Sequence, residues 1–300
     1  MLTGIHFLLT YTCNWECDHC FLFCSPRSEG TFTLAQIRQT LDEARKIPSL
    51  EWVYFEGGEP TLYYPLLVEG VRLARERGFR TGVVTNAYWA ACVEDARLWL
   101  APFVELGLED LSLSDDAFHH EGEVTPGGTA LAAARSLGLP ACSICVEKPT
   151  VERTGARGAP VVGGGSMLRG RAAEKLTDGL PTRAAAELTS CPHEDLECPG
   201  RVHLDPKGHV HLCQGLSLGN FLQTPLSVLV SSYDAAGHPI CGPLVRGGPA
   251  GLAKEYGVNI GDRFVDECHY CYLVRKSLRE RFPELLAPPQ VYGREPNEEG

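Results

Sequence analysis

Four cysteines lie close together near the start of the chain, in the stretch "TCNWECDHCFLFC" at 12–24. Cys13, Cys17 and Cys20 follow the pattern C-x3-C-x2-C, and Cys24 comes after them. This spacing lets three thiolates bind one face of an iron-sulfur cluster, whereas a cubane usually takes four cysteines. One iron would then be open to a substrate or cofactor. A structural zinc site with Cys24 as its fourth ligand is the alternative, although such sites favour paired C-x2-C units.

The elements that must position these thiols form a regular alternation. Short apolar runs are followed by amphipathic stretches, and glycines close three of the latter, at Gly78, Gly107 and Gly138. Repeated βα units predict a parallel sheet or barrel whose chemistry lies in the loops after the strands. The cysteine stretch, "GGEP", "TNA" and "SDDAFHH" all fall in such loops. We expect strands at 4–10, 50–58, 79–86, 108–114 and 140–147, and helices at 33–47, 64–78, 93–107 and 127–138.

The stretch "CNWECDHC" resembles the cluster motif of the radical S-adenosylmethionine (SAM) enzymes, and "GGEP" resembles a second motif of that family. The resemblance implies that Cys13, Cys17 and Cys20 bind a [4Fe-4S] cluster whose open iron is chelated by SAM. His19 occupies the place of an aromatic residue, and Cys24 lies outside the motif as a free thiol. Paired glycines permit close backbone approach, and a carboxylate suits the SAM ammonium group. The second motif comprises Gly57, Gly58, Glu59 and Pro60.

Two later strand ends resemble the same family. "VVTNA" (83–87) implicates Thr85 and Asn86 near the methionine moiety or ribose of SAM. In "LSLSDDAFHH" (111–120), Ser112 and Ser114 share one face of the strand, because side chains alternate. We expect Ser114 and Asp115 to line the pocket. His119 or His120 would face substrate, where a histidine suits proton transfer near neutrality, and the alternative for both is a solvated loop.

A second set of cysteines follows from about 190 onward. Cys198, Gly208 and Cys213 give C-x9-G-x4-C, and Cys268-x2-Cys271 follows, as in the auxiliary-cluster modules called twitch and SPASM. The resemblance implies one auxiliary [4Fe-4S] cluster on Cys198, Cys213, Cys268 and Cys271, since two cubanes would need eight thiolates. A zinc ribbon on the same four cysteines is the alternative. Cys191 or Cys241 could replace one of them. The paired Cys142 and Cys145 fall in a strand on opposite faces, and with Cys92 they are expected in the core.

The fold class implied is α/β, a partial (β/α)6 TIM-like barrel with a small C-terminal α+β cysteine-rich module. We expect a core domain at 1–185, the auxiliary module at 186–287 and a disordered Pro-rich, acidic tail at 288–300. A hairpin is expected at 201–213, a final helix at 272–282, and a sixth strand around 159–164. The basic, glycine-rich stretch 153–175 is expected to be a flexible loop.

The activity implied is that of an oxygen-sensitive radical SAM oxidoreductase or peptide-modifying enzyme. Electron transfer from a donor such as flavodoxin or ferredoxin would cleave SAM to a 5'-deoxyadenosyl radical that abstracts hydrogen from substrate. A peptide or protein side chain is the favoured substrate. The alternatives are dehydrogenation or epimerisation of a small molecule and, from another class, a non-catalytic iron-sulfur or zinc protein.

Composition limits the remaining classes. The 300-residue chain carries a net charge of -11, which argues against general nucleic-acid binding. Its opening residues do not read as a signal peptide, and no stretch reads as a membrane span. We therefore expect a cytoplasmic protein, in which thirteen cysteines indicate metal binding or catalysis rather than disulfides.

Overall fold

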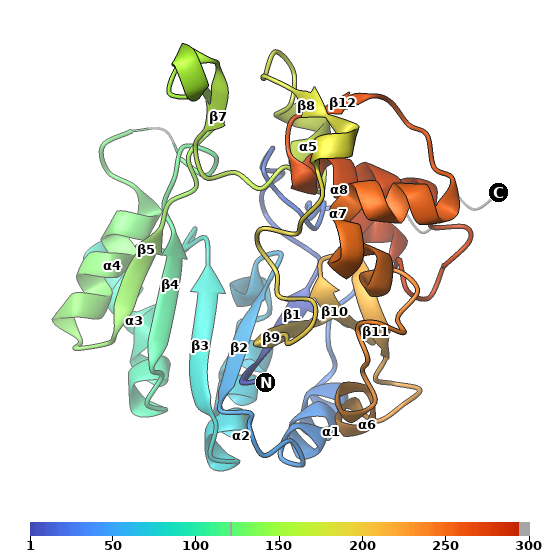
Figure 1. Cartoon of the computed structure of the whole chain (residues 1–300). Helices are drawn as coiled ribbons and strands as arrows, with labels where there is room; N and C mark the ends of the chain where they lie inside the picture. Colours follow the sequence, from blue (N-terminus) through green and yellow to red (C-terminus); the bar gives the residue numbers. More distant parts are fainter. Residues whose placement is uncertain (121, 294–300) are drawn as a thin grey trace.

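A computed structural model describes residues 1–120 and 122–293 of the chain. Its main sheet has the order β11-β10-β9-β1-β2-β3-β4-β5, and β9 and β1 to β5 run parallel to one another. The strand ends that carry the predicted motifs therefore meet at the same edge, at the top of Figure 1. The strands are β1 Gly4–Thr10, β2 Trp52–Gly57, β3 Arg80–Thr85, β4 Asp110–Ser114, β5 Ala141–Ile144, β9 Arg201–Leu204, β10 His209–Cys213 and β11 Leu216–Asn220.

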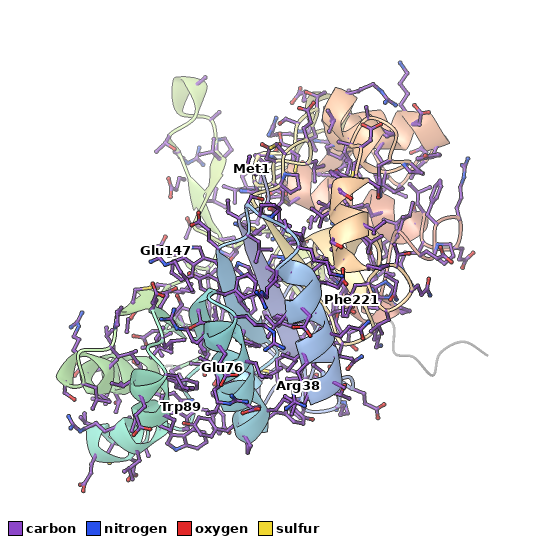
Figure 2. The ribbon with its side chains drawn as sticks, turned by 90° about the horizontal axis from the view of Figure 1, so that it is seen from below. Met1, Arg38, Glu76, Trp89, Glu147 and Phe221 are labelled. Carbon is purple, nitrogen blue, oxygen red and sulfur yellow. The ribbon has the colours of Figure 1, made fainter. Side chains whose placement is uncertain are left out.

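The helices between the first strands form as the sequence predicts. Thr33 begins the first of them with a capping box to Gln36, which satisfies two backbone donors that a helix start leaves free. Gly78, Gly107 and Gly138 have φ of 87°, 68° and 69°, as left-handed caps require. Figure 2 shows this helix layer from below, with Arg38 and Glu76 on it. The helices are α1 Leu34–Ala44, α2 Tyr64–Glu76, α3 Val93–Glu105 and α4 Pro126–Ser136.

The two faces of the sheet differ in character, since one packs apolar side chains against the helices and the other carries polar side chains. Phe55 of β2 faces α2, because a Cβ on Gly70 of that helix would lie 2.8 Å from its ring. Phe7 of β1 stacks on Phe55 at 5.1 Å, and both are fully buried. Since side chains alternate along a strand, Glu56 points to the opposite face, away from the helices. That face carries the polar side chains described below.

The C-terminal part of the chain extends the same sheet. The expected hairpin is present as β9 and β10, and β9 pairs directly with β1. The sixth strand expected around 159–164 is wrong. A strand does form at 161–163, but it pairs antiparallel with β6 in a separate two-stranded sheet, and the sixth parallel strand of the main sheet is β9, beside β1. The remaining elements are β6 Thr150–Glu152, β7 Val161–Gly163, α5 Arg171–Lys175, β8 Arg183–Ala184, α6 Leu226–Ser231, α7 Cys241–Tyr256, β12 Arg263–Phe264 and α8 Glu267–Ser277, with 3-10 turns at Pro60–Tyr63, Ala156–Gly158, Ala185–Glu187 and Pro289–Tyr292.

Other expectations differ from the structure. Cys142 and Cys145 are exposed rather than buried, because β5 is the edge strand of the sheet, and Cys92 is exposed where it caps α3. The expected disorder from 288 is wrong for 288–293, because Tyr292 is fully buried there. Residues 294–300 lie outside the described part of the chain. Among the described residues, no helix is both long and apolar enough to cross a membrane.

Candidate functional site

The three cysteines of the first motif line one cavity of about 270 Å3 beyond the end of β1. Their loop is held by the end of β2, where Gly58 donates its N–H to the Thr10 carbonyl at 2.7 Å. A Cβ on Gly58 would lie 2.2 Å from the Thr12 carbonyl oxygen. Glycine is therefore required at position 58 because the backbone after β2 packs directly against the backbone at Thr12. This requirement holds whether or not a ligand also approaches Gly58. Cys13, Cys17 and Cys20 therefore lie together on the wall of one cavity.

Glu59, the acid of the second motif, has its carboxylate directed into the protein. The side chain is buried, and its oxygens accept hydrogen bonds from Thr85 Oγ1 at 2.7 Å and Asn86 N at 2.8 Å. It also accepts from Thr61 N at 3.0 Å. Burial raises the pKa of this carboxyl, and the same donors oppose the increase. This differs from the expected direct contact with SAM, since Glu59 and Pro60 do not line the cavity whereas Gly57 and Gly58 do.

The rest of the cavity wall brings together strand ends that are distant in sequence. His19, Thr85, Asn86 and Ser114 all line it, as the sequence suggests. Asn86 Nδ2 lies 3.9 Å from Cys13 Sγ, which connects the third strand to the cysteine loop. Burial lowers the pKa of His19 to about 4, so this ring is neutral at pH 7.

The residues after β4 divide between two cavities. His119 lines the cysteine cavity, where its Nδ1 lies 2.8 Å from Asp116 Oδ1. Asp115 and His120 instead line a separate, more open cavity of about 750 Å3. Asp116 borders both, and sequence reasoning missed it. The sequence does contain a signal for it, the adjacent pair Asp115-Asp116. Because neighbouring side chains of an extended segment point to opposite sides, only one of the two aspartates can face the cysteine cavity.

Arg171 supports the cysteine loop from behind. It is 8% exposed, and its guanidinium donates to the carbonyls of Cys17 at 2.7 Å and Cys24 at 2.9 Å. Within the described residues it has no carboxylate partner at ion-pair distance. A buried charge is costly unless it is paired, so the site suits an anionic group held by the neighbouring thiolates.

The thiols themselves differ in acidity. Burial raises the pKa of Cys13 and Cys17 to about 12. A hydrogen bond from Cys24 lowers the pKa of Cys20 to about 6, against the effect of burial. Cys24 is itself buried and lines the same cavity, so it lies nearer the three motif cysteines than the sequence suggested.

The second set of cysteines also meets at one cavity, but Cys191 takes the place expected for Cys198. Cys191, Cys213, Cys268 and Cys271 line a cavity of about 30 Å3. Cys198 does not line it and is exposed, with its Sγ 2.5 Å from the amino group of Met1. The turn before β9 directs Cys198 toward the start of the chain. Cys241 is buried but does not line the cavity either.

Two buried arginines face this second set. Arg169 donates to Cys213 Sγ at 2.9 Å and lies 3.4 Å from Glu194. Arg275 is 1% exposed, donates to the Gln214 carbonyl at 2.9 Å and lies 3.8 Å from Cys213 Sγ. No carboxylate of the described residues pairs with Arg275. Its charge is therefore balanced only if the cysteines are thiolates, which is the form that binds metal.

The segment 169–171 joins the two cysteine sets. Arg169 contacts the second set and Arg171 the first, although only Gly170 separates them. Gly170 has φ of 61°, and a Cβ on it would lie 2.4 Å from Phe21 Cα. The sequence signal was the basic, glycine-rich stretch 153–175, which was expected to be a flexible loop. Residues 168–173 of this stretch are instead buried.

Comparison with known proteins identifies the first half of the chain. Residues 7–143 match the family model described as the radical SAM superfamily. The chain is 38% identical to a tungsten-containing aldehyde ferredoxin oxidoreductase cofactor-modifying protein of Pyrococcus furiosus, over 26% of this chain and 22% of that protein. It is 26% identical to the putative peptide biosynthesis protein YydG of Bacillus subtilis, over 36% of this chain and 34% of YydG. The matches thus span about a fifth to a third of these relatives.

A solved structure shares the fold over more of the chain. BtrN in complex with AdoMet and 2-DOIA superposes with a TM-score of 0.51 and 16% identity, covering 76% of this chain and 82% of BtrN. At this identity the likeness concerns the fold alone. The superposed share of this chain is nevertheless larger than residues 7–143.

Proposed function

Because residues 7–143 match the family model of the radical SAM superfamily, we propose that this chain is an enzyme that cleaves SAM reductively and removes a hydrogen atom from a substrate. The observation that carries this proposal is the convergence of Cys13, Cys17 and Cys20 on one cavity that has additional space. When bound, a [4Fe-4S] cluster and SAM supply the radical chemistry, and the protein's task is to orient them and exclude water.

The first cavity fits these groups through its donor set. Three thiols converge, and the unpaired guanidinium of Arg171 favours their ionised form. We assign SAM to the wall formed by Gly57, Gly58, Thr85, Asn86 and Ser114. Glu59 is a positioning residue for Thr85 and Asn86, because its carboxylate binds both. Asp116 and His119 form a hydrogen-bonded pair at this wall and are the acid-base candidates in place of Asp115 and His120.

The second set fits an anionic metal centre on Cys191, Cys213, Cys268 and Cys271. An auxiliary [4Fe-4S] cluster is the proposal, because the chain resembles radical SAM enzymes that carry such modules. A structural zinc ion is a second candidate, which the small cavity of about 30 Å3 favours, a volume comparable to the ~30 Å3 share of one liquid water. Both centres need four thiolates, and both would balance Arg169 and Arg275. Iron and zinc analysis of the purified protein separates them.

A peptide or protein side chain is the proposed substrate. Asp116 connects the cysteine cavity to the open cavity of about 750 Å3, which has an acidic lining that includes Asp115 and Glu123. Such a surface accommodates an extended, basic peptide better than it encloses a small molecule. The similarity to a putative peptide biosynthesis protein agrees with this reading. Dehydrogenation or epimerisation of a small molecule is the alternative.

The state of the cysteines indicates in which compartment the protein works. All thirteen cysteines are free, which suits a reducing compartment, and we therefore propose a cytoplasmic enzyme supplied by an electron donor such as flavodoxin or ferredoxin.

The function is tested by anaerobic reconstitution with iron and sulfide, followed by dithionite and SAM. We expect the wild-type chain to form 5'-deoxyadenosine and the Cys13→Ala, Cys17→Ala, Cys20→Ala variant to form none. No product from a wild-type chain that holds its iron would mean a non-catalytic iron-sulfur protein. A short precursor peptide encoded beside the chain should raise product formation and change in mass if the substrate is a peptide.

A further inference from the structure

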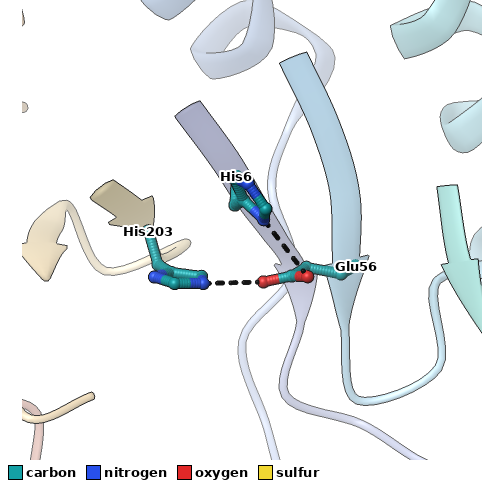
Figure 3. A group of neighbouring side chains, drawn as sticks. All are labelled: His6, Glu56 and His203. Carbon is teal, nitrogen blue, oxygen red and sulfur yellow. Dashed lines mark ion pairs between the residues drawn. The ribbon is translucent and has the colours of Figure 1, made fainter. Parts of the chain in front are cut away.

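A third group of side chains that could hold a metal ion lies on the face of the sheet opposite the helices. His6 of β1, Glu56 of β2 and His203 of β9 each offer one ligand atom, and these atoms lie within 4.8 Å of one another (Figure 3). His6 and His203 are paired in register across β1 and β9. The parallel sheet thus brings together three residues that are far apart in sequence. None of them belongs to a motif that the sequence suggested.

The distances in this group match those between two ligands of one ion. His6 Nδ1 lies 3.3 Å from Glu56 Oε2, and His203 Nε2 lies 3.1 Å from Glu56 Oε1. Imidazole and carboxylate ligands lie about 2.0 to 2.2 Å from zinc, so two ligands of one ion are about 3 to 3.5 Å apart. Despite its proximity to Glu56, His6 Nδ1 is buried and makes no hydrogen bond with any described residue. The ring nitrogen therefore approaches the carboxylate without directing an N–H at it.

The surroundings of the group give an ion both burial and access. His203 is 5% exposed, and Glu56 lines the cavity of the first cysteine set. His6 lines a different cavity, of about 430 Å3, which is more open and also has Glu194 and Asp195 in its wall. The group therefore lies between the cavity of the first cysteine set and a more open, polar cavity through which a cation can enter.

We propose that His6, Glu56 and His203 bind one divalent transition-metal ion, distinct from the metal centres of both cysteine sets. Two imidazoles and one carboxylate are a ligand set used by zinc and by non-haem iron(II), and three protein ligands leave a coordination position open. Because Glu56 borders the cysteine cavity, the ion lies at the floor of the space in which substrate reacts. This site is independent of SAM cleavage.

The competing explanation is that the histidines only neutralise a buried acid. Burial alone would raise the pKa of Glu56, but His6 and His203 together hold it well below the usual range. In that case the group would stabilise the sheet and bind no ion. Stacking of His6 on Tyr54 at 4.6 Å is compatible with either role.

Cobalt(II) distinguishes the two explanations in the cluster-loaded protein, in which the cysteines of the two sets already hold their clusters. The reconstituted protein is treated with a chelator, dialysed anaerobically against Co2+ and analysed for cobalt. We expect one cobalt per chain, with X-ray absorption showing nitrogen and oxygen donors and no sulfur. His203→Gln should weaken retention by more than about tenfold, since even partners that only orient a ligand contribute 10- to 100-fold.

The matched control is His209→Gln on the adjacent strand β10. His209 also has a buried Nδ1 without a hydrogen-bond partner, but it lies outside the group. Iron content and melting temperature show whether each variant folds, and His6→Gln provides a second, partly exposed position. No cobalt on the wild-type chain, sulfur donors to cobalt, or equal loss with His209→Gln would overturn the proposal.

Discussion

The two cysteine sets of this chain differ in what surrounds them. The first presents three motif cysteines to a cavity of about 270 Å3, whereas the second closes four cysteines around about 30 Å3. Both are backed by a buried arginine that has no carboxylate partner in the described chain, Arg171 in one case and Arg275 in the other. The difference in space indicates that the first set serves a reaction and that the second holds a compact metal centre.

Removing the second set should have the largest effect on metal content. Replacing Cys191, Cys213, Cys268 and Cys271 with alanine should remove about four irons per chain and leave some uncoupled SAM cleavage. Cys198→Ala should change neither, because Cys198 lies outside the cavity. Iron analysis together with 5'-deoxyadenosine measurement checks both. Loss of iron from the Cys198→Ala variant would contradict this assignment and favour Cys198 over Cys191 as the fourth ligand.

Arg275 tests whether the second set is anionic. In the metal-loaded protein, Arg275→Met should cost about 3 to 5 kcal/mol of unfolding free energy, because it leaves buried negative charge unpaired. In the metal-free protein the same change should be neutral or stabilising, since the guanidinium then has no counter-charge. Denaturant unfolding of both forms measures the difference. Equal destabilisation in both forms would assign Arg275 a packing role only.

Gly58 tests how the first set depends on the backbone of β2. Gly58→Ala should cost about 1 to 3 kcal/mol and reduce cluster occupancy, because the new Cβ would meet the Thr12 carbonyl beside Cys13. Gly247→Ala is the control, since a Cβ there meets nothing within 4 Å. Thermal unfolding and iron content of the two variants are compared. Equal stability and equal iron content in the two variants would show that the backbone contact between Gly58 and Thr12 does not support the cysteine loop.

Asp205 tests the connection between the loop after β1, which carries the first cysteine set, and strand β10. It is fully buried, accepts from Tyr11 at 2.8 Å and lies 3.2 Å from His211 Nε2. Burial would raise its pKa, but His211 and His209 lower it below the usual value. A depressed pKa contributes stability that is present above about pH 4 and is lost as pH falls below it.

Asp205→Asn should therefore cost about 1 to 3 kcal/mol at pH 7 and flatten the acid limb of the stability profile. Unfolding measured between pH 2 and 7 checks this expectation. An unchanged acid limb would show that other carboxyl groups dominate it.

Much of the fold was predictable because its signals are local. The strands, the three glycine-capped helices and the hairpin follow from periodicity and turn residues within each segment. The membership of the second set was not predictable, because the choice between Cys191 and Cys198 depends on the path of a turn. The roles of Glu59, Arg169 and Arg171 were hidden for the same reason, since their partners lie on other segments. Periodicity also gave no sign that β9 would complete the parallel sheet and place His203 beside His6.

The most direct test of the central claim is the electron paramagnetic resonance spectrum of the reduced first cluster. It is measured in the variant that lacks Cys191, Cys213, Cys268 and Cys271, with and without SAM labelled with 15N and 17O at its amino and carboxylate groups. We predict that SAM shifts the spectrum and that both labels couple to the cluster, equally with Cys24 present or replaced by alanine. A spectrum that SAM changes only after Cys24→Ala, or does not change at all, would contradict the open iron on which this account depends.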